Sequence, residues 1–211
     1  MKISELASQA GVPVTAVKYY QREGLLPLGK KSAPNQTSYD HTHVQRVRLV
    51  RALLGTGGLS VAAAKEVIAA FDSAPLPEVF SVAQHAMSSS RTSEPEPSPQ
   101  ARERVVAVAR AQAWKITDDN PGIDAAARAL DGLTAIGFDA PDAYLLSYAA
   151  AAATAAAADL HALAELPTPE QQAELMVVGS VLGDPLFAGL RRLAQEDATH
   201  DEFRTDSKED Q

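Results

Sequence analysis

Cations and a hydroxyl recur at helical spacing in the stretch VTAVKYYQREGLLP, residues 14–27. On a helix, Lys18 and Arg22 are four residues apart and Thr15 precedes Lys18 by three, so the three side chains share one face. Two cations and a hydroxyl on one face suit phosphate groups and base edges. We therefore predict that this segment contacts nucleic acid.

Two adjacent tyrosines lie in the same stretch. Tyr19 and Tyr20 point about 100° apart on a helix, so one ring can pack inward while the other presents its hydroxyl outward. A solvated helix with two core aromatics is the alternative. The flanking sequence has to decide between these interpretations.

The flanking residues predict a helix-turn-helix followed by a two-stranded wing. ISELASQAG has apolar residues at helical spacing, with Ser4 as the expected N-cap and Gly11 at the end. Pro13 turns the chain into a second helix that continues to about Glu23. The run LLPLGKKSAPNQTSY then has Pro, Gly, Ser and Asn around Lys30 and Lys31 and indicates a two-stranded wing with a basic tip.

Two further helices complete this unit in the sequence. Asp40 or Thr42 caps HVQRVRLVRALLGTG, whose valines form an apolar stripe with the arginines off it. Ser60 caps the next helix, which runs through VAAAKEVIAAFD. Four helices and a wing within 72 residues form one small domain.

Charge is unevenly distributed along the 211 residues. Residues 1–72 carry a net +4 and residues 73–211 a net -12, which together give -8. A basic head on an acidic body is typical of a nucleic-acid-binding protein. Cysteine is absent, which excludes disulfides, thiolate metal sites and cysteine nucleophiles. The N-terminus has no long apolar leader, so we expect a cytoplasmic protein.

Residues 1–72 resemble the winged helix-turn-helix domain of the MerR family of bacterial transcription regulators. The resemblance rests on ISELASQAGV, VTAVKYYQREGLLP, a tyrosine that ends the wing, and DHTHVQRVRLVRALLGTGGLSVAAAKEVI. It implies a homodimer that binds a palindromic promoter element in double-stranded DNA. It also implies an activator that distorts the promoter so that RNA polymerase can engage it.

The resemblance implies DNA contacts at eight positions. They lie in the recognition helix and the wing: Thr15, Lys18, Tyr19, Arg22, Lys30, Lys31, Thr37 and Tyr39. Lys18 stands where the family usually has arginine, which keeps the charge but loses the bidentate fork. Thr37 stands where the wing usually has arginine, and Gln36 where it has an aromatic residue.

The segment after residue 72 departs from the family pattern, in which a dimerisation helix follows the DNA-binding domain. Family members continue into a long helix that forms an antiparallel coiled coil, whereas here Pro75 and Pro77 interrupt the segment. About twelve residues, 77–88, can be helical. We predict that residues 73–100 are a short helix and a Ser/Pro/Glu-rich linker.

Beyond the linker the sequence predicts an all-α bundle of about five helices over residues 101–198, followed by an acidic tail, 199–211. Asn120 with Pro121, and Asp184 with Pro185, are expected helix starts. The alanine run 149–158 favours close helix packing over a membrane span, because alanine is only weakly hydrophobic. The expected fold class is therefore mostly α, a winged helix-turn-helix with a small β wing followed by a helical bundle.

No catalytic, cofactor or metal motif stands out in the sequence, so we expect a protein that is not an enzyme. His41 and His43 are close in sequence, but a capping or surface role suits a helix start better than zinc does. An unidentified small-molecule effector would find aromatic side chains in the C-terminal part, where Trp114, Tyr144 and Tyr148 are the ligand-binding candidates. These aromatics also suit a simple core.

Three classes of function therefore compete. A MerR-type transcription regulator explains the basic head, the wing and the acidic body together. A DNA-architectural factor of the excisionase kind explains the head but needs no second domain. A ligand-sequestering helical protein with a DNA-binding head needs a large pocket. We favour the regulator.

Overall fold

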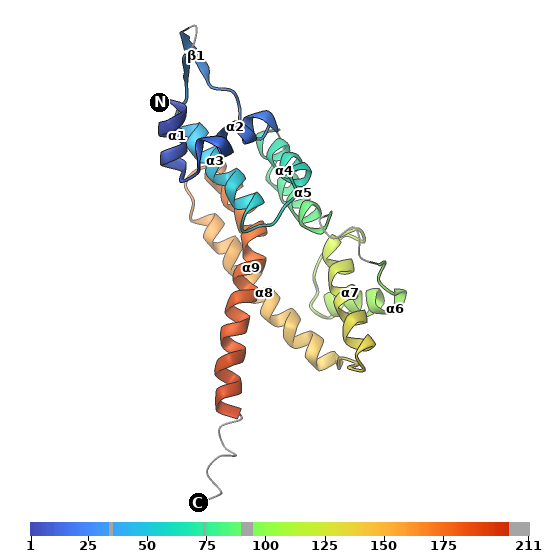
Figure 1. Cartoon of the computed structure of the whole chain (residues 1–211). Helices are drawn as coiled ribbons and strands as arrows, with labels where there is room; N and C mark the ends of the chain where they lie inside the picture. Colours follow the sequence, from blue (N-terminus) through green and yellow to red (C-terminus); the bar gives the residue numbers. More distant parts are fainter. Residues whose placement is uncertain (34–35, 74, 90–94, 203–211) are drawn as a thin grey trace, which may run out of the picture.

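The computed structural model describes residues 1–33, 36–73, 75–89 and 95–202 (Figure 1). The head contains α1 (Ile3–Ala10), α2 (Val14–Arg22), β1 (Lys30–Ala33), β2 (Gln36–Ser38), α3 (His41–Leu54) and α4 (Val61–Ser73). The remainder contains α5 (Leu76–Ser89), α6 (Pro99–Ala111), α7 (Pro121–Ala135), α8 (Asp142–Ala164) and α9 (Pro169–Glu202). The predicted fold class, mostly α with a small β wing, is confirmed. Parts of the wing tip, the predicted linker and the acidic tail lie outside the described residues.

Helix ends follow the local sequence signals except at Ser4 and at the start predicted for Asp184 and Pro185. Gly11 ends α1 at φ 69°, a left-handed conformation that glycine adopts without steric cost. Asp40 caps α3, and Asn120 caps α7 by accepting from the Gly122 N–H at 2.9 Å. The expectation that Ser4 caps α1 is wrong. The helix begins at Ile3, because the Glu5 carboxylate accepts from the Lys2 N–H at 2.9 Å and closes the first turn two residues earlier.

The main hydrophobic core joins α1 to α5 with the distant helix α9. Leu6, Val17 and Val47 of the head are fully buried in it. Val177 and Val181 of α9 lie in the same cluster and are 0% and 1% exposed. Figure 1 shows α9 running beside α3 and then continuing away from the head. The core of the head is therefore completed by residues from the end of the chain.

Helix α9 is continuous, whereas the sequence predicted a break at Asp184 and Pro185. Pro185 lies inside the helix. It has no N–H to donate to the carbonyl of Val181, and the helix continues past that missing bond. Burial of Val177 and Val181 fixes the helix just before Pro185, and packing of this kind outweighs the local preference of proline. Residues 101–202 accordingly contain four helices among the described residues, one fewer than expected.

The other late helices form a small second cluster. Ala101 of α6, Ala127 and Leu130 of α7 and Ala140 before α8 are buried together. Helix α8 is mostly exposed, with only Ala149 and Leu163 buried. The stretch Asp142–Ala164 and the stretch Gln171–His200 are long and apolar enough to cross a membrane, with mean hydropathies of 1.2 and 1.4, which is weak evidence by itself.

Candidate nucleic-acid interface

The predicted cationic face of α2 is exposed. Thr15, Lys18 and Arg22 face solvent, and the Arg22 side chain is 72% exposed. Val17 and Tyr20 on the other side of the helix are buried in the head. Burial of one face therefore holds the other face outward in a fixed orientation.

The two tyrosines divide between the core and the surface, as their angular separation predicts. Tyr20 is buried, and this burial raises the pKa of its phenol, while the charge of Arg51 opposes the shift. Tyr19 is half-buried and lies beneath Arg22, whose guanidinium carbon is 5.2 Å from the ring centroid. Tyr19 therefore supports the Arg22 side chain at the exposed face.

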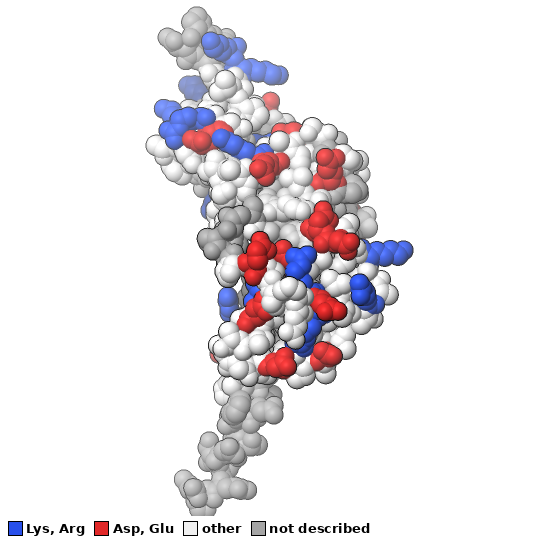
Figure 2. Space-filling view, turned by 90° about the vertical axis from the view of Figure 1, so that its right-hand side faces the viewer, with Lys and Arg blue, Asp and Glu red and all other residues white. Residues whose placement is uncertain are grey.

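The wing presents lysines on both of its faces. Lys30 pairs with Ser38 and Lys31 with Thr37, and both lysines and Thr37 are exposed. Neighbouring residues of a strand point to opposite faces, so Lys31 and Thr37 share one face while Lys30 lies on the other. Figure 2 shows Lys and Arg side chains gathered at the end of the molecule that carries the wing, and Asp and Glu side chains more frequent further down.

Tyr39 differs from the other predicted contact residues because it is buried. Its hydroxyl accepts from Gln21 Nε2 at 3.2 Å, and its ring lies edge-on to His43 at 5.3 Å. The Tyr39 N–H donates to the Met1 carbonyl at 2.9 Å. The amino group of Met1 donates to the Tyr39 carbonyl at 2.6 Å. These contacts tie the base of the wing to α2, α3 and the N-terminus, so Tyr39 is placed to position the wing.

The arginines of α3 hold the head together. Arg48 donates to the carbonyl of Gln9 at 2.8 Å and Arg51 to that of Gly11 at 3.1 Å, at the carbonyl end of α1. Arg46 pairs with Asp72 of α4. Cations at a helix C-terminus satisfy carbonyls that have no partner within the helix. The sequence showed only that these arginines lie off the apolar stripe, and their partners are up to 40 residues away.

Asp40 and His43 form a second fixed group, at the start of α3 beneath the wing. The Asp40 carboxylate accepts from the Thr42 N–H at 3.1 Å and lies 2.7 Å from His43 Nδ1. Hydrogen bonds from the Thr42 hydroxyl and then from His43 hold the pKa of Asp40 well below its usual range. His43 is 8% exposed, and its role in capping agrees with the preference for a cap over a zinc ligand.

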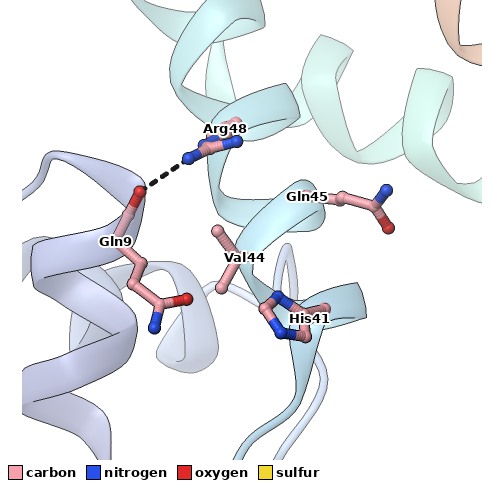
Figure 3. Close-up of a pocket in the computed structure, with 5 residues that line it drawn as sticks. All are labelled: Gln9, His41, Val44, Gln45 and Arg48. Atoms are coloured by element: carbon pink, nitrogen blue, oxygen red, sulfur yellow. Dashed lines mark hydrogen bonds between the residues drawn. The ribbon is translucent and has the colours of Figure 1, made fainter.

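A shallow hollow of about 440 Å³ lies between α1 and the start of α3 (Figure 3). It is lined by Gln9, His41, Val44, Gln45 and Arg48. The guanidinium of Arg48 spans it to the Gln9 carbonyl, so the charge is already engaged. None of the predicted ligand-binding aromatics contributes to this hollow.

Two of the three predicted ligand-binding residues lie together. The rings of Tyr144 and Tyr148 are 4.7 Å apart, and their hydroxyls are 3.0 Å apart. Arg191 of α9 lies over Tyr148 at 5.2 Å and donates to its hydroxyl. The hydrogen bond to Tyr148 raises the pKa of Tyr144. Among the described residues no ring contact joins Trp114 to either tyrosine, and the cluster fastens α8 to α9.

Comparison with known proteins relates the head to a family of transcription regulators. Residues 1–70 match the model of the MerR HTH family regulatory protein. A 50-residue segment is 36% identical to an HTH-type transcriptional regulator, a ZntR homologue of Haemophilus influenzae, and covers 24% of this chain and 37% of that relative. The chain thus matches little more than a third of the length of this curated relative.

Solved structures extend the similarity beyond the head. SCO5550 of Streptomyces coelicolor A3(2), described as a candidate transcriptional regulator, is 26% identical, with a TM-score of 0.71 over 96% of this chain and 98% of that one. The transcription regulator PbrR691 of Ralstonia metallidurans CH34, solved in complex with lead(II), is 24% identical over 54% of this chain and 83% of that one, with a TM-score of 0.39. The second score is too low to support a shared architecture.

The fold and the exposed cationic face define a winged helix-turn-helix protein. The family match makes the definition more specific: residues 1–70 are a MerR-family helix-turn-helix domain, as the sequence predicted.

Proposed function

We propose that this protein is a cytoplasmic, sequence-specific transcription regulator that binds a promoter palindrome as a homodimer. The observation that carries the proposal is the face of α2, where Thr15, Lys18 and Arg22 are exposed while Val17 and Tyr20 are buried. Lys30 and Lys31 on the wing extend the positive surface beyond the recognition helix. Such an arrangement combines base contacts with backbone contacts.

We further propose that the bound dimer activates transcription by distorting the promoter for RNA polymerase. In this proposal residues 1–72 bind DNA, and residues 101–198 hold the dimer and any small-molecule effector. Helix α9 serves both parts, because Val177 and Val181 pack into the head while Arg191 contacts Tyr148 of α8. A change at α8 therefore has a direct mechanical route to the head.

Selection of bound fragments from genomic DNA tests the proposal. We expect an inverted repeat between or beside promoter boxes, and transcription from that promoter in vitro should rise when the protein is added. Recovery of recombination sites in place of promoters would support an architectural factor. Failure to enrich any sequence would contradict sequence-specific regulation.

A further inference from the structure

An apolar row on the outer half of α9 is exposed in the described part of the chain. Leu186, Leu190 and Leu193 are 64%, 56% and 64% exposed. Their spacing of four and three places them on one face of the helix. Single exposed leucines are ordinary on protein surfaces, but a continuous row usually marks an interaction site.

This row lies opposite the face that α9 buries in the head. Leu186 follows Val177 by nine residues and Leu190 follows Val181 by nine, which is half a turn out of phase at 100° per residue. Val177 and Val181 are buried against the head. The leucine row therefore points away from the core of its own chain.

Two glycines interrupt the same face of the helix. Gly183 precedes Leu186 by three residues, and Gly189 lies between Leu186 and Leu193 at helical spacing. A methyl group at either glycine would meet no atom within 4 Å. A glycine inside a helix is less favourable than an alanine at the same position. No contact within the described chain explains why these two positions lack a side chain. Close approach of another backbone would explain it, because only glycine leaves the space.

The accessible area of the chain leaves room for a large interface. The chain exposes 14062 Å². A compact monomer of 22.3 kDa exposes roughly 9,400 Å² by the usual scaling with mass. The excess is larger than the roughly 1,000–2,500 Å² that each copy contributes to an obligate homodimer.

We propose that the outer half of α9 crosses the same helix of a second copy, with the two helices antiparallel about a two-fold axis. The crossing lies near residue 188. Leucines of one copy then fill the gaps that Gly183 and Gly189 leave in the other, and a two-fold axis makes this exchange reciprocal. The inference rests on the proposed function in that a palindrome requires two heads related by such an axis.

A lipid bilayer fits this face less well than a second copy does. Arg191 and Arg192 lie between Leu190 and Leu193 in the sequence but on other sides of the helix, and Glu196 and Asp197 follow Leu193 by three and four residues. Each such charge is costly to place in hydrocarbon, whereas it stays in water at the rim of a helix crossing. A crossing of two α9 helices leaves these charges outside the contact.

The geometry of α9 also spaces the two heads. Each head is held near residue 179, about nine residues from the crossing, so the two attachment points lie roughly 27 Å apart along the helices. This span is of the order of one turn of B-DNA, about 34 Å. The crossing therefore places two heads at a separation suited to adjacent half-sites.

Sedimentation of full-length variants tests the crossing. We expect Leu190→Asp to raise the dimer dissociation constant at least 100-fold. The matched control is Leu160→Asp on α8, an equally exposed leucine at 61%, which should leave the constant unchanged. Circular dichroism confirms that both variants are folded. A dimer unaffected by Leu190→Asp, or a wild-type protein that is monomeric at all concentrations, would overturn the proposal.

Cross-linking supplies a second readout that does not depend on loss of function. The chain contains no cysteine, so Leu190→Cys introduces a single thiol at the crossing. A short bismaleimide should link this variant into dimers and leave Leu160→Cys monomeric, and the reverse pattern would refute the location. Binding of the Leu190→Asp variant to a half-site separates the two hypotheses. It persists if the protein binds DNA, whatever the oligomeric state of the variant, and it is absent if the proposed function is wrong.

Discussion

At the scale of single residues, the same cation type has two different roles in the head. Lys18 and Arg22 face solvent on α2. Arg48 and Arg51, only one helix away, hold the carbonyl end of α1. Arg22 does have a partner in its own chain, because its Nε donates to the carboxylate of the adjacent Glu23 at 3.2 Å. The difference is that Arg48 and Arg51 are tied to another helix, whereas Arg22 is held only by the next residue and its side chain stays 72% exposed.

Substitution of the exposed pair should weaken DNA binding. We expect Lys18→Ala and Arg22→Ala each to lower affinity roughly tenfold, the equivalent of one charge-assisted hydrogen bond of about 1.5 kcal/mol. If the lost contact is to phosphate, the slope of log affinity against log salt should fall by about one. Fluorescence anisotropy at several salt concentrations measures both quantities. Lys115→Ala, far along the chain, is the control, and equal affinity for all three variants would exclude this docking face.

The cap at the start of α3 should make the head sensitive to acid. The pKa of Asp40 is lowered in the folded state by hydrogen bonds from Thr42 and His43, so its contribution to stability is present above the unfolded pKa of about 3.9 and is lost as pH falls below it. Thermal unfolding temperatures of wild type and Asp40→Ala should therefore differ most at pH 7, and the difference should shrink progressively as pH falls below about 4. Asp159→Ala on α8 should match wild type throughout. A constant difference at all pH values would contradict the assignment.

At the scale of elements, the sequence predicts the helix starts and helix faces that depend only on residues close together in the chain. Asn120, Ser60 and Asp40 mark helix starts because their side chains bond backbone N–H groups two or three residues ahead. The exposed face of α2 follows from spacing within nine residues.

Contacts between distant elements were not predictable in this way. Nothing in the local pattern indicates that Val177 and Val181 pack into a core more than 90 residues earlier, or that α9 continues through Pro185. Gly57, in the turn between α3 and α4, gives the clearest case, because a methyl group there would overlap Val181. Part of the constraint on Gly57 therefore comes from the distant Val181, and part from the nearby carbonyl oxygen of Leu53, 2.8 Å from the added carbon.

The contact between α9 and the head should contribute measurably to the free energy of unfolding. We expect Val181→Ala to destabilise the protein by roughly 2 kcal/mol, because it removes two buried methylene equivalents and leaves a cavity. Urea unfolding measures the loss, and amide exchange should quicken in α3 and α4. Leu160→Ala, exposed on α8, is the matched control. Unchanged exchange in α3 would show that α9 does not support the head.

At the scale of the whole molecule, two heads on one rigid dimer should impose a fixed spacing on the operator. B-DNA repeats every 10 to 10.5 base pairs, so inserting five between the half-sites turns one of them to the opposite side of the duplex. We expect affinity to fall at least tenfold, toward that of a single half-site. Gel shifts with the recovered operator measure this, with a five-base-pair insertion outside the palindrome as control. Equal binding to both insertions would indicate independently bound heads.

The position of Val177 and Val181 also affects how the chain folds as it is synthesised. The last helix of the head, α4, ends at Ser73, but its core is not complete until α9 has been made. At 5–20 residues per second, the intervening stretch takes on the order of 5–20 s to translate. During that interval the apolar surface that α9 later covers stays open to chaperones or to other nascent chains. A ribosome that stalls before α9 would therefore release a head with its hydrophobic core partly exposed, a natural target for proteolysis before it reaches DNA.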